Sequence, residues 1–229
     1  MSVEMGQSRT AGSIVDVTCA VTLVGGGKLG PDEVNTCLAR APTLVAADGG
    51  ADVALRAGLV PVAVIGDLDS LSQAARSAFA DRLHAVEAQD TTDFEKCLQR
   101  VKAPLVLAAG FLGGRLDHTL STLSVLARLR AHHVVLVGED QVVVLARRGR
   151  SRIVATPGRR VALLPLGEAV VSSDGLVWDM DAMALAADGQ VSSSNGARSD
   201  LVTLDVQGPV LITLEPADLD FATDYALGR

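Results

Sequence analysis

Four short segments combine carboxylates, glycines and basic residues in an order that suits metal and phosphate chemistry. They lie at residues 48–52, 66–70, 90–96 and 113–119. Carboxylates crowded together repel one another unless a cation lies among them, at a cost on the order of 4 kcal/mol for two charges ~4 Å apart at an effective dielectric of about 20. A hard cation such as Mg²⁺ prefers oxygen ligands and is commonly bound with phosphates. The four segments therefore predict a protein that handles a nucleotide.

Residues 66–70, Gly-Asp-Leu-Asp-Ser, follow an apolar run that is predicted to be a buried strand. Side chains two residues apart on extended backbone point the same way, so Asp67 and Asp69 can offer two carboxylates to one metal ion. The alternative is an ordinary turn between a strand and a helix, because Asp and Ser are common there. The segment alone favours the turn, and the acidic segments around it favour the metal site.

The segment that begins at Asp90 is predicted to start a helix. Thr92 and Glu95 fit a capping box, with Thr92 as the N-cap residue. Capping does not explain Asp90, and the helix dipole explains Asp93 only in part. Asp93 and Lys96, three residues apart, share one helix face. A metal-binding carboxylate beside a phosphate-binding lysine is one interpretation, and an ordinary solvated lysine is the other.

Residues 113–119 contain two glycines, which allow backbone amides to approach a phosphate. Arg115 carries a forked donor that suits phosphate oxygens. Asp117 fits a helix cap. His118 fits packing or capping better than catalysis, so it is not predicted to be a site residue.

Two further glycine-rich turns are weak signals alone. Asp48 is followed by two glycines, which is typical of a generic turn. Residues 25–28, Gly-Gly-Gly-Lys, suggest a phosphate loop but lack the ending and spacing of a P-loop.

The segments would be positioned by alternating strands and helices in the first part of the chain. Buried strands are predicted at 20–24, 43–47, 62–65, 105–109 and 134–137, and helices at 32–40, 51–57, 73–82, 93–101 and 118–130. This alternation predicts an α/β domain with a doubly wound, mostly parallel sheet. Ligands bind beyond the carboxyl ends of the strands in such sheets, and all four segments fall there.

Helical patterns are not predicted after Arg147. Short strands are predicted at 152–155, 160–165, 169–172, 189–193, 201–206 and 210–214. Residues 203–206 and 210–214 resemble the two arms of a hairpin around Gln-Gly-Pro. The predicted organisation is a disordered segment at 1–13, a catalytic α/β domain at 14–147 and a small all-β sandwich or barrel at 148–229.

Composition excludes several classes of function. The 229 residues carry a net charge of −7, which argues against a nucleic-acid or anionic-membrane partner. The three cysteines have no paired spacing and are expected to be reduced. The apolar stretch at 14–24 is broken by Asp16, is too short to span a bilayer, and follows no basic segment. We therefore expect a cytoplasmic protein.

The second half of the chain offers one aromatic residue and one polar stretch that could bind a ligand. Trp178 is the single tryptophan, and it fits either a sandwich core or a face that stacks on a flat cationic ring. Ser192 and Asn195 belong to a serine-rich stretch that fits either a loop or the wall of a small-molecule pocket.

Taken together, the chain resembles the thiamine pyrophosphokinase family from about residue 20 to residue 215. The motifs that carry the resemblance lie at 47–51, 65–70, 92–96 and 113–120, in the family's order, with weaker ones at 175–178 and 192–195. The resemblance implies transfer of a diphosphate from ATP to the hydroxyl of thiamine, giving thiamine diphosphate and AMP. It also implies a homodimer with the thiamine site at the subunit interface.

The resemblance further implies a role for each matching residue. Asp67, Asp69 and Asp93 would bind Mg²⁺, supported by Asp48 and Asp90. Lys96 and Arg115 would contact phosphate, with Asp117 near the nucleotide or thiamine. The thiamine side would comprise Trp178, Ser192 and Asn195. Gly196 and Ala197 stand where the family often carries an acidic or aromatic residue, which makes the metal site the better supported part.

Three other activities fit parts of the pattern. A pyrophosphokinase for another hydroxymethyl heterocycle, such as a pterin, could use the same metal and ATP groups, whereas Trp178 and the serine-rich stretch favour thiamine. A non-catalytic binder of nucleotide or thiamine would not need so costly a carboxylate cluster. A Mg²⁺-dependent phosphohydrolase would release phosphate without an acceptor alcohol.

Overall fold

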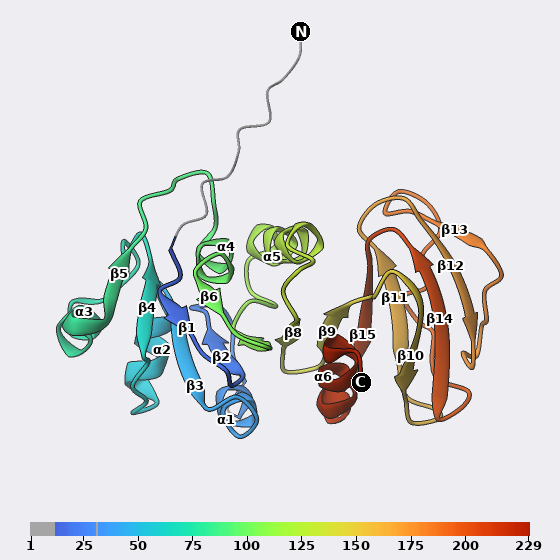
Figure 1. Cartoon of the computed structure of the whole chain (residues 1–229), viewed down its shortest axis with the longest axis horizontal. Coiled ribbons are helices and arrows are strands. Elements are labelled where there is room, and N and C mark those ends of the chain that lie inside the picture. The colour runs from blue at the N-terminus through green and yellow to red at the C-terminus, as the bar shows by residue number, and fades with distance from the viewer. Residues whose placement is uncertain (1–11, 31) are drawn as a thin grey trace, which may run out of the picture.

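A nine-stranded mixed sheet forms the centre of the computed structural model, which describes residues 12–30 and 32–229 (Figure 1). Its parallel part contains, in order across the sheet, β8 (Val134–Val137), β7 (Val106–Ala109), β2 (Val21–Val24), β3 (Thr43–Ala47), β4 (Ala63–Gly66) and β5 (Leu83–Ala85). Beyond β8, the antiparallel strands β9 (Val142–Leu145), β15 (Val210–Leu214) and β11 (Val161–Pro165) complete it.

Helices cover both faces of this sheet. They are α1 (Glu33–Leu38), α2 (Gly50–Arg56), α3 (Gln73–Ala78), α4 (Asp93–Leu98), α5 (Leu116–Arg128) and α6 (Leu219–Leu227), with 3₁₀ turns at Ala80–Arg82 and Pro216–Asp218. Figure 1 shows α4 and α5 on one face and α1 and α6 on the other. Alternate strand residues serve the two faces: Leu23 and Val45 pack with α4 and α5, whereas Val24 and Leu44 pack with α2.

The antiparallel second sheet packs beside the far edge of the first (Figure 1). Its order is β10 (Gly149–Val154), β14 (Leu201–Gln207), β12 (Ala169–Asp174) and β13 (Met183–Leu185). Buried residues of β10 and β14 share one core with those of β11 and β15. The expected class, an α/β sheet followed by a β sandwich, is confirmed. A short parallel pair, β1 (Val15–Asp16) with β6 (Val101–Lys102), lies apart.

The predicted hairpin at 203–214 is wrong, because β14 and β15 belong to different sheets. Gly208, at φ +109°, and Pro209 carry the chain from one sheet to the other. β14 is buried on alternate residues, as expected for a sheet with one solvated face, whereas β15 is mostly buried on both faces. The large sheet therefore continues past residue 147, where the sequence predicted a domain boundary.

Two other expectations for the second half are also wrong. Residues 189–193 form no strand and contribute only the single bridge of Ser192 to Leu163. Helix α6 contradicts the expected loss of helices after Arg147. Its apolar residues recur at helical spacing, and Gly228 ends it in a left-handed conformation at φ +76°, so both signals were present in the sequence.

The beginning of the chain is described only from Gly12 onward, so most of the segment expected to be disordered lies outside the described residues. Its last residue, Ser13, donates hydrogen bonds from its hydroxyl to the carbonyls of Val15 and Arg100. None of the helices in the described part of the chain is both long and apolar enough to cross a bilayer.

Tyr225 of helix α6 is 2% exposed and joins this helix to the start of the second half of the chain. Its hydroxyl accepts the backbone N–H of Arg147 at 2.9 Å and lies 2.9 Å from the Ser151 hydroxyl. Tyr225→Phe should lower the free energy of unfolding by about 1–2 kcal/mol, because the Arg147 N–H loses its acceptor. Urea denaturation measures this, with Ser151→Ala as the milder control. Equal losses in both variants would show that the Arg147 contact contributes nothing.

Candidate active site

A large hollow lies where the strands of the parallel sheet end, and its cavity volume is about 1020 Å³. Its walls include Gly25 after β2, Asp48 after β3, Asp67 after β4 and Gly110 after β7. The strand order reverses between β2 and β7, because β3 follows on one side of β2 while β7 lies on the other. This is the topological switch point at which open α/β sheets bind ligands.

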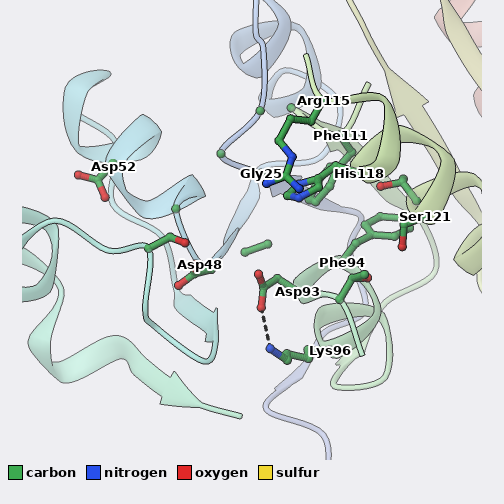
Figure 2. A pocket seen from close by; sticks show the side chains of 18 of the residues that line it. Gly25, Asp48, Asp52, Asp93, Phe94, Lys96, Phe111, Arg115, His118 and Ser121 are labelled. Atoms are coloured by element: carbon green, nitrogen blue, oxygen red, sulfur yellow. Dashed lines mark hydrogen bonds and ion pairs between the residues drawn. The ribbon is translucent and has the colours of Figure 1, made fainter. Parts of the chain in front are cut away.

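Three carboxylates meet in this hollow. One oxygen from each of Asp48, Asp67 and Asp93 lies within 4.8 Å of the others. Figure 2 shows the Asp48 and Asp93 side chains pointing toward the same space. Asp48 is 3% exposed, and its Oδ1 has no hydrogen-bond partner among the described residues. Burial raises the pKa of Asp48, and the negative charges of Asp93 and Asp67 raise it further.

Lys96 neutralises part of this negative charge from the buried side of the acidic group. Its Nζ donates to Asp67 Oδ2 at 2.7 Å and to Asp93 Oδ1 at 3.0 Å, and the residue is only 2% exposed (Figure 2 draws the bond to Asp93). The hydrogen bond from Lys96 lowers the pKa of Asp67. Burial lowers the pKa of Lys96, but its two carboxylate partners outweigh burial and the net pKa is raised. The pair formed by Asp67 and Lys96 is therefore held in its ionised form.

The start of α4 aims Asp93 and Lys96 at this point. The Thr92 hydroxyl accepts the N–H of Glu95 at 3.3 Å, which confirms Thr92 as the N-cap residue. The Glu95 carboxylate does not complete the box and instead binds Arg128 of α5 through two hydrogen bonds of 2.8 and 2.7 Å. Because Glu95 is buried, this pair fixes α4 against α5.

Gly66 makes room for the three carboxylates. A Cβ at this position would lie 2.7 Å from the Asp48 Cβ and 3.2 Å from Asp93 Oδ1. Asp48 itself has a left-handed backbone, at φ +41°, which Asp tolerates better than most residues. Only a glycine at position 66 lets the strand ends of β3 and β4 bring their acidic groups so close.

Asp69 and Asp90 lie outside the three-carboxylate group. Leu68 adopts φ +67° and buries its side chain in the core, so the chain turns between Asp67 and Asp69. Extended alternation does not hold there, and Asp69 is exposed and accepts the Ser70 hydroxyl at 2.9 Å. Asp90 is also exposed, in the loop before α4.

Arg115 and Asp117 form an exposed ion pair on the opposite wall of the hollow. Arg115 Nε lies 3.1 Å from Asp117 Oδ1, and a second guanidinium nitrogen binds Oδ2. The hydrogen bond from Arg115 lowers the pKa of Asp117 to about 2. Gly113 and Gly114 precede the pair with φ of +75° and +70°, so the turn requires residues that tolerate the left-handed region.

Several lining residues were not predicted. They are Asp52, Arg56, Thr91, Phe94, Phe111, His118, Ser121 and Thr122. The rings of Phe94 and Phe111 lie 4.8 Å apart between centroids and form an apolar wall beside the acidic one (Figure 2). The available signals were their positions, two residues after the capping Thr92 and two residues after the end of β7, whereas Ser121 and Thr122 give no sign of a site in sequence.

Trp178, Ser192 and Asn195 do not line this hollow. Asn195 is buried, donates to the Trp178 carbonyl at 2.8 Å and to the Ser192 hydroxyl at 3.0 Å, and accepts the Trp178 N–H at 3.1 Å. It therefore ties two loops together. Trp178 is 63% exposed, which rules out the core position that an isolated tryptophan would be expected to take.

Comparisons with known proteins point to one family. Residues 34–137 match the family model for the catalytic domain of thiamin pyrophosphokinase, and residues 150–211 match the model for its vitamin B1 binding domain. The chain is 26% identical over 181 residues to thiamine pyrophosphokinase 1 of Arabidopsis thaliana, covering 71% of this chain and 68% of the relative. It is likewise 26% identical to thiamine pyrophosphokinase 3 of rice (Oryza sativa subsp. japonica), covering 76% and 79%.

Solved structures share the fold. The thiamin pyrophosphokinase of Candida albicans superimposes with a TM-score of 0.74 at 19% identity, covering 86% of this chain and 89% of that one. The yeast thiamin pyrophosphokinase also gives a TM-score of 0.74, at 21% identity, covering 92% and 90%.

Lys96→Met should destabilise the protein by about 2 kcal/mol at pH 7, a value discounted because Asp67 and Asp93 are partly exposed. Lys96 depresses the pKa of Asp67, so its stabilisation is present above the unfolded pKa and is lost as the pH falls through the folded value. The difference in unfolding free energy between Lys96→Met and wild type should therefore narrow below about pH 4. Urea denaturation across pH measures this.

Lys102→Met is the matched control, because Lys102 is exposed and its one ion-pair partner among the described residues is the exposed Asp16. The Lys102→Met substitution should lower the free energy of unfolding by less than about 0.5 kcal/mol. A loss in Lys96→Met that does not change with pH would contradict the assigned pairing.

Proposed function

The chain belongs to the thiamine pyrophosphokinase family, and on this premise we propose that it transfers the diphosphate of ATP to the hydroxyl of thiamine, yielding thiamine diphosphate and AMP. The observation that carries the proposal is the group formed by Asp48, Asp67 and Asp93 at the switch point of the catalytic half. Such a group suits a metal-bound polyphosphate.

The acidic group fits Mg²⁺. Its donors are all carboxylate oxygens, and the buried, unpartnered Oδ1 of Asp48 is a polar atom that a cation would satisfy. We assign Asp48, Asp67 and Asp93 as the residues that would hold the ion. When bound, Mg²⁺ would neutralise charge on the phosphates. Asp69 and Asp90 remain candidates for contact from the rim.

Other residues of the chain would bind and orient the nucleotide. Arg115 is exposed to the hollow and can exchange Asp117 for phosphate oxygens. Residues 25–27 line the hollow with backbone and no side chain, which allows close approach of phosphate. Lys96 acts by holding the Asp67 and Asp93 side chains in place, and reaches phosphate only if it leaves them.

Transfer at the β-phosphorus requires the thiamine hydroxyl to be held in line with AMP as the leaving group. The reaction depends on positioning and charge neutralisation, with little covalent work for the protein. The hollow suits both requirements, because the acidic group and Arg115 line it and its volume of about 1020 Å³ can hold a nucleotide.

We further propose a homodimer in which each thiamine site is shared. Trp178 is exposed and does not line the hollow of its own chain, which supports a site in which Trp178 comes from a second copy. The positively charged thiazolium ring suits such an aromatic face. Exposed Leu116 and Leu120 on α5, next to the hollow, offer apolar surface for that contact.

We also propose that the protein is located in the cytoplasm. All three cysteines are free, and Cys37 and Cys97 are buried, as suits a reducing compartment.

Purified protein with ATP, Mg²⁺ and thiamine should form AMP and thiamine diphosphate in equal amounts. Asp67→Asn should lower this turnover at least about 100-fold while leaving the fold intact, because it removes a carboxylate from the acidic group. Chromatographic quantification of both products, with circular dichroism of the variant, measures this. ADP with thiamine monophosphate would overturn attack at the β-phosphorus, and phosphate release without thiamine would indicate a phosphohydrolase.

Trp178→Ala should raise the KM for thiamine several-fold more than the KM for ATP. A stronger test mixes Trp178→Ala with Asp67→Asn subunits after dissociation and reassociation. If the site is shared, mixed dimers contain one intact site, and activity assayed at thiamine concentrations far below the raised KM should recover to about a quarter of wild type. No recovery, with mixed dimers demonstrated by mass, would place the whole thiamine site within one chain.

A further inference from the structure

A basic groove runs along the opposite end of the large sheet from the candidate active site. It consists of three adjoining hollows with cavity volumes of about 520, 380 and 400 Å³. The first lies at residues 98–104 and 131–133, which precede β7 and β8, and it shares His132 and His133 with the second. The second shares Arg147 with the third, which reaches β10. The three hollows are therefore neighbours, and together they are called the groove below.

Arginines line the groove throughout its length. They are Arg100, Arg130, Arg147, Arg148, Arg150 and Arg152. None of the six forms an ion pair with any residue that the structure describes, and no Asp or Glu of the described chain lines any of the three hollows. Arg229 also lines the third hollow, and one further cation is partly compensated, because Lys102 pairs with Asp16.

This concentration of charge stands out in a protein of net charge −7. One explanation is protection of an edge, because β10 is an edge strand of the second sheet and basic side chains discourage strand pairing there. Edge protection accounts for Arg150 and Arg152. It does not account for Arg100, Arg130 or Arg147, which lie off β10. Unpaired like charges repel one another, so their collection in one groove favours an anionic partner.

We infer that the groove binds an acidic segment of another polypeptide, in which Asp or Glu residues are interspersed with apolar ones. The forked guanidinium group pairs bidentately with carboxylates. Between the arginines, the walls are apolar and include Leu126, Leu145 and Leu227, which suits apolar side chains of the same segment.

Other polyanions fit the groove less well. Single-stranded nucleic acid requires exposed aromatic faces on which bases stack, and Tyr225, the aromatic residue that lines the groove, is almost fully buried. An anionic bilayer is a broad, flat surface and would meet only the rim of concave hollows.

Fluorescence anisotropy with a labelled peptide of alternating Glu and Leu tests the inference on the full chain. The peptide should bind, the isosteric peptide of alternating Gln and Leu should not, and binding should weaken with added salt. Arg130→Gln combined with Arg147→Gln should weaken binding roughly tenfold or more, because two charge-assisted contacts are lost.

Arg56→Gln combined with Arg160→Gln is the matched control, since it removes the same charge from exposed or partly exposed positions outside the groove. This variant should bind the peptide within about twofold of wild type. Urea denaturation verifies that both variants fold. The inference fails if the peptide does not bind or if both variants weaken it equally. It also fails if a single-stranded oligonucleotide, or vesicles containing phosphatidylserine, bind more tightly than the peptide through Arg147.

Discussion

The candidate site depends on the repulsion among Asp48, Asp67 and Asp93. The ends of strands β3 and β4 and the start of helix α4 each bring one carboxylate to the same point, which no apolar packing would favour. Lys96 compensates two of the charges from the buried side, and Asp48 is left with an unpartnered oxygen and a raised pKa. The acidic group therefore keeps a negative charge that no side chain compensates among the described residues. A metal-bound nucleotide would compensate it.

Several structural features serve this arrangement. The missing side chain at Gly66 allows the acidic groups to approach, and the clamp of Glu95 with Arg128 keeps α4, which carries Asp93 and Lys96, from moving away from α5. Because Asp117 stands at the start of α5, the same clamp also fixes the distance between the acidic wall and the Arg115 wall. The acidic wall and the Arg115 wall are therefore coupled through one ion pair, whose carboxylate is buried and whose guanidinium group is half exposed.

Local patterns in the sequence predicted most of the parallel sheet and its helices, because hydrophobic periodicity and capping are local. Thr92 caps α4 for that reason. The sequence could not reveal that Leu68 adopts a left-handed backbone, and this alone removes Asp69 from the acidic group. The sequence also could not assign β15 to the large sheet, because the sheet that a strand joins depends on which elements pack against the strand's two faces. The exposure of Trp178 likewise depends on loops tied together by Asn195.

The continuity of the large sheet has a consequence for how the chain is synthesised. β9 is formed by residue 145, but its outer neighbour, β15, is translated some sixty residues later, and β11 attaches only to β15. Until the last part of the chain leaves the ribosome, β9 presents an unpaired apolar edge, and such edges invite association with other chains. The nascent protein therefore completes its catalytic half only when its C-terminal strand arrives, so the two halves mature together rather than one after the other.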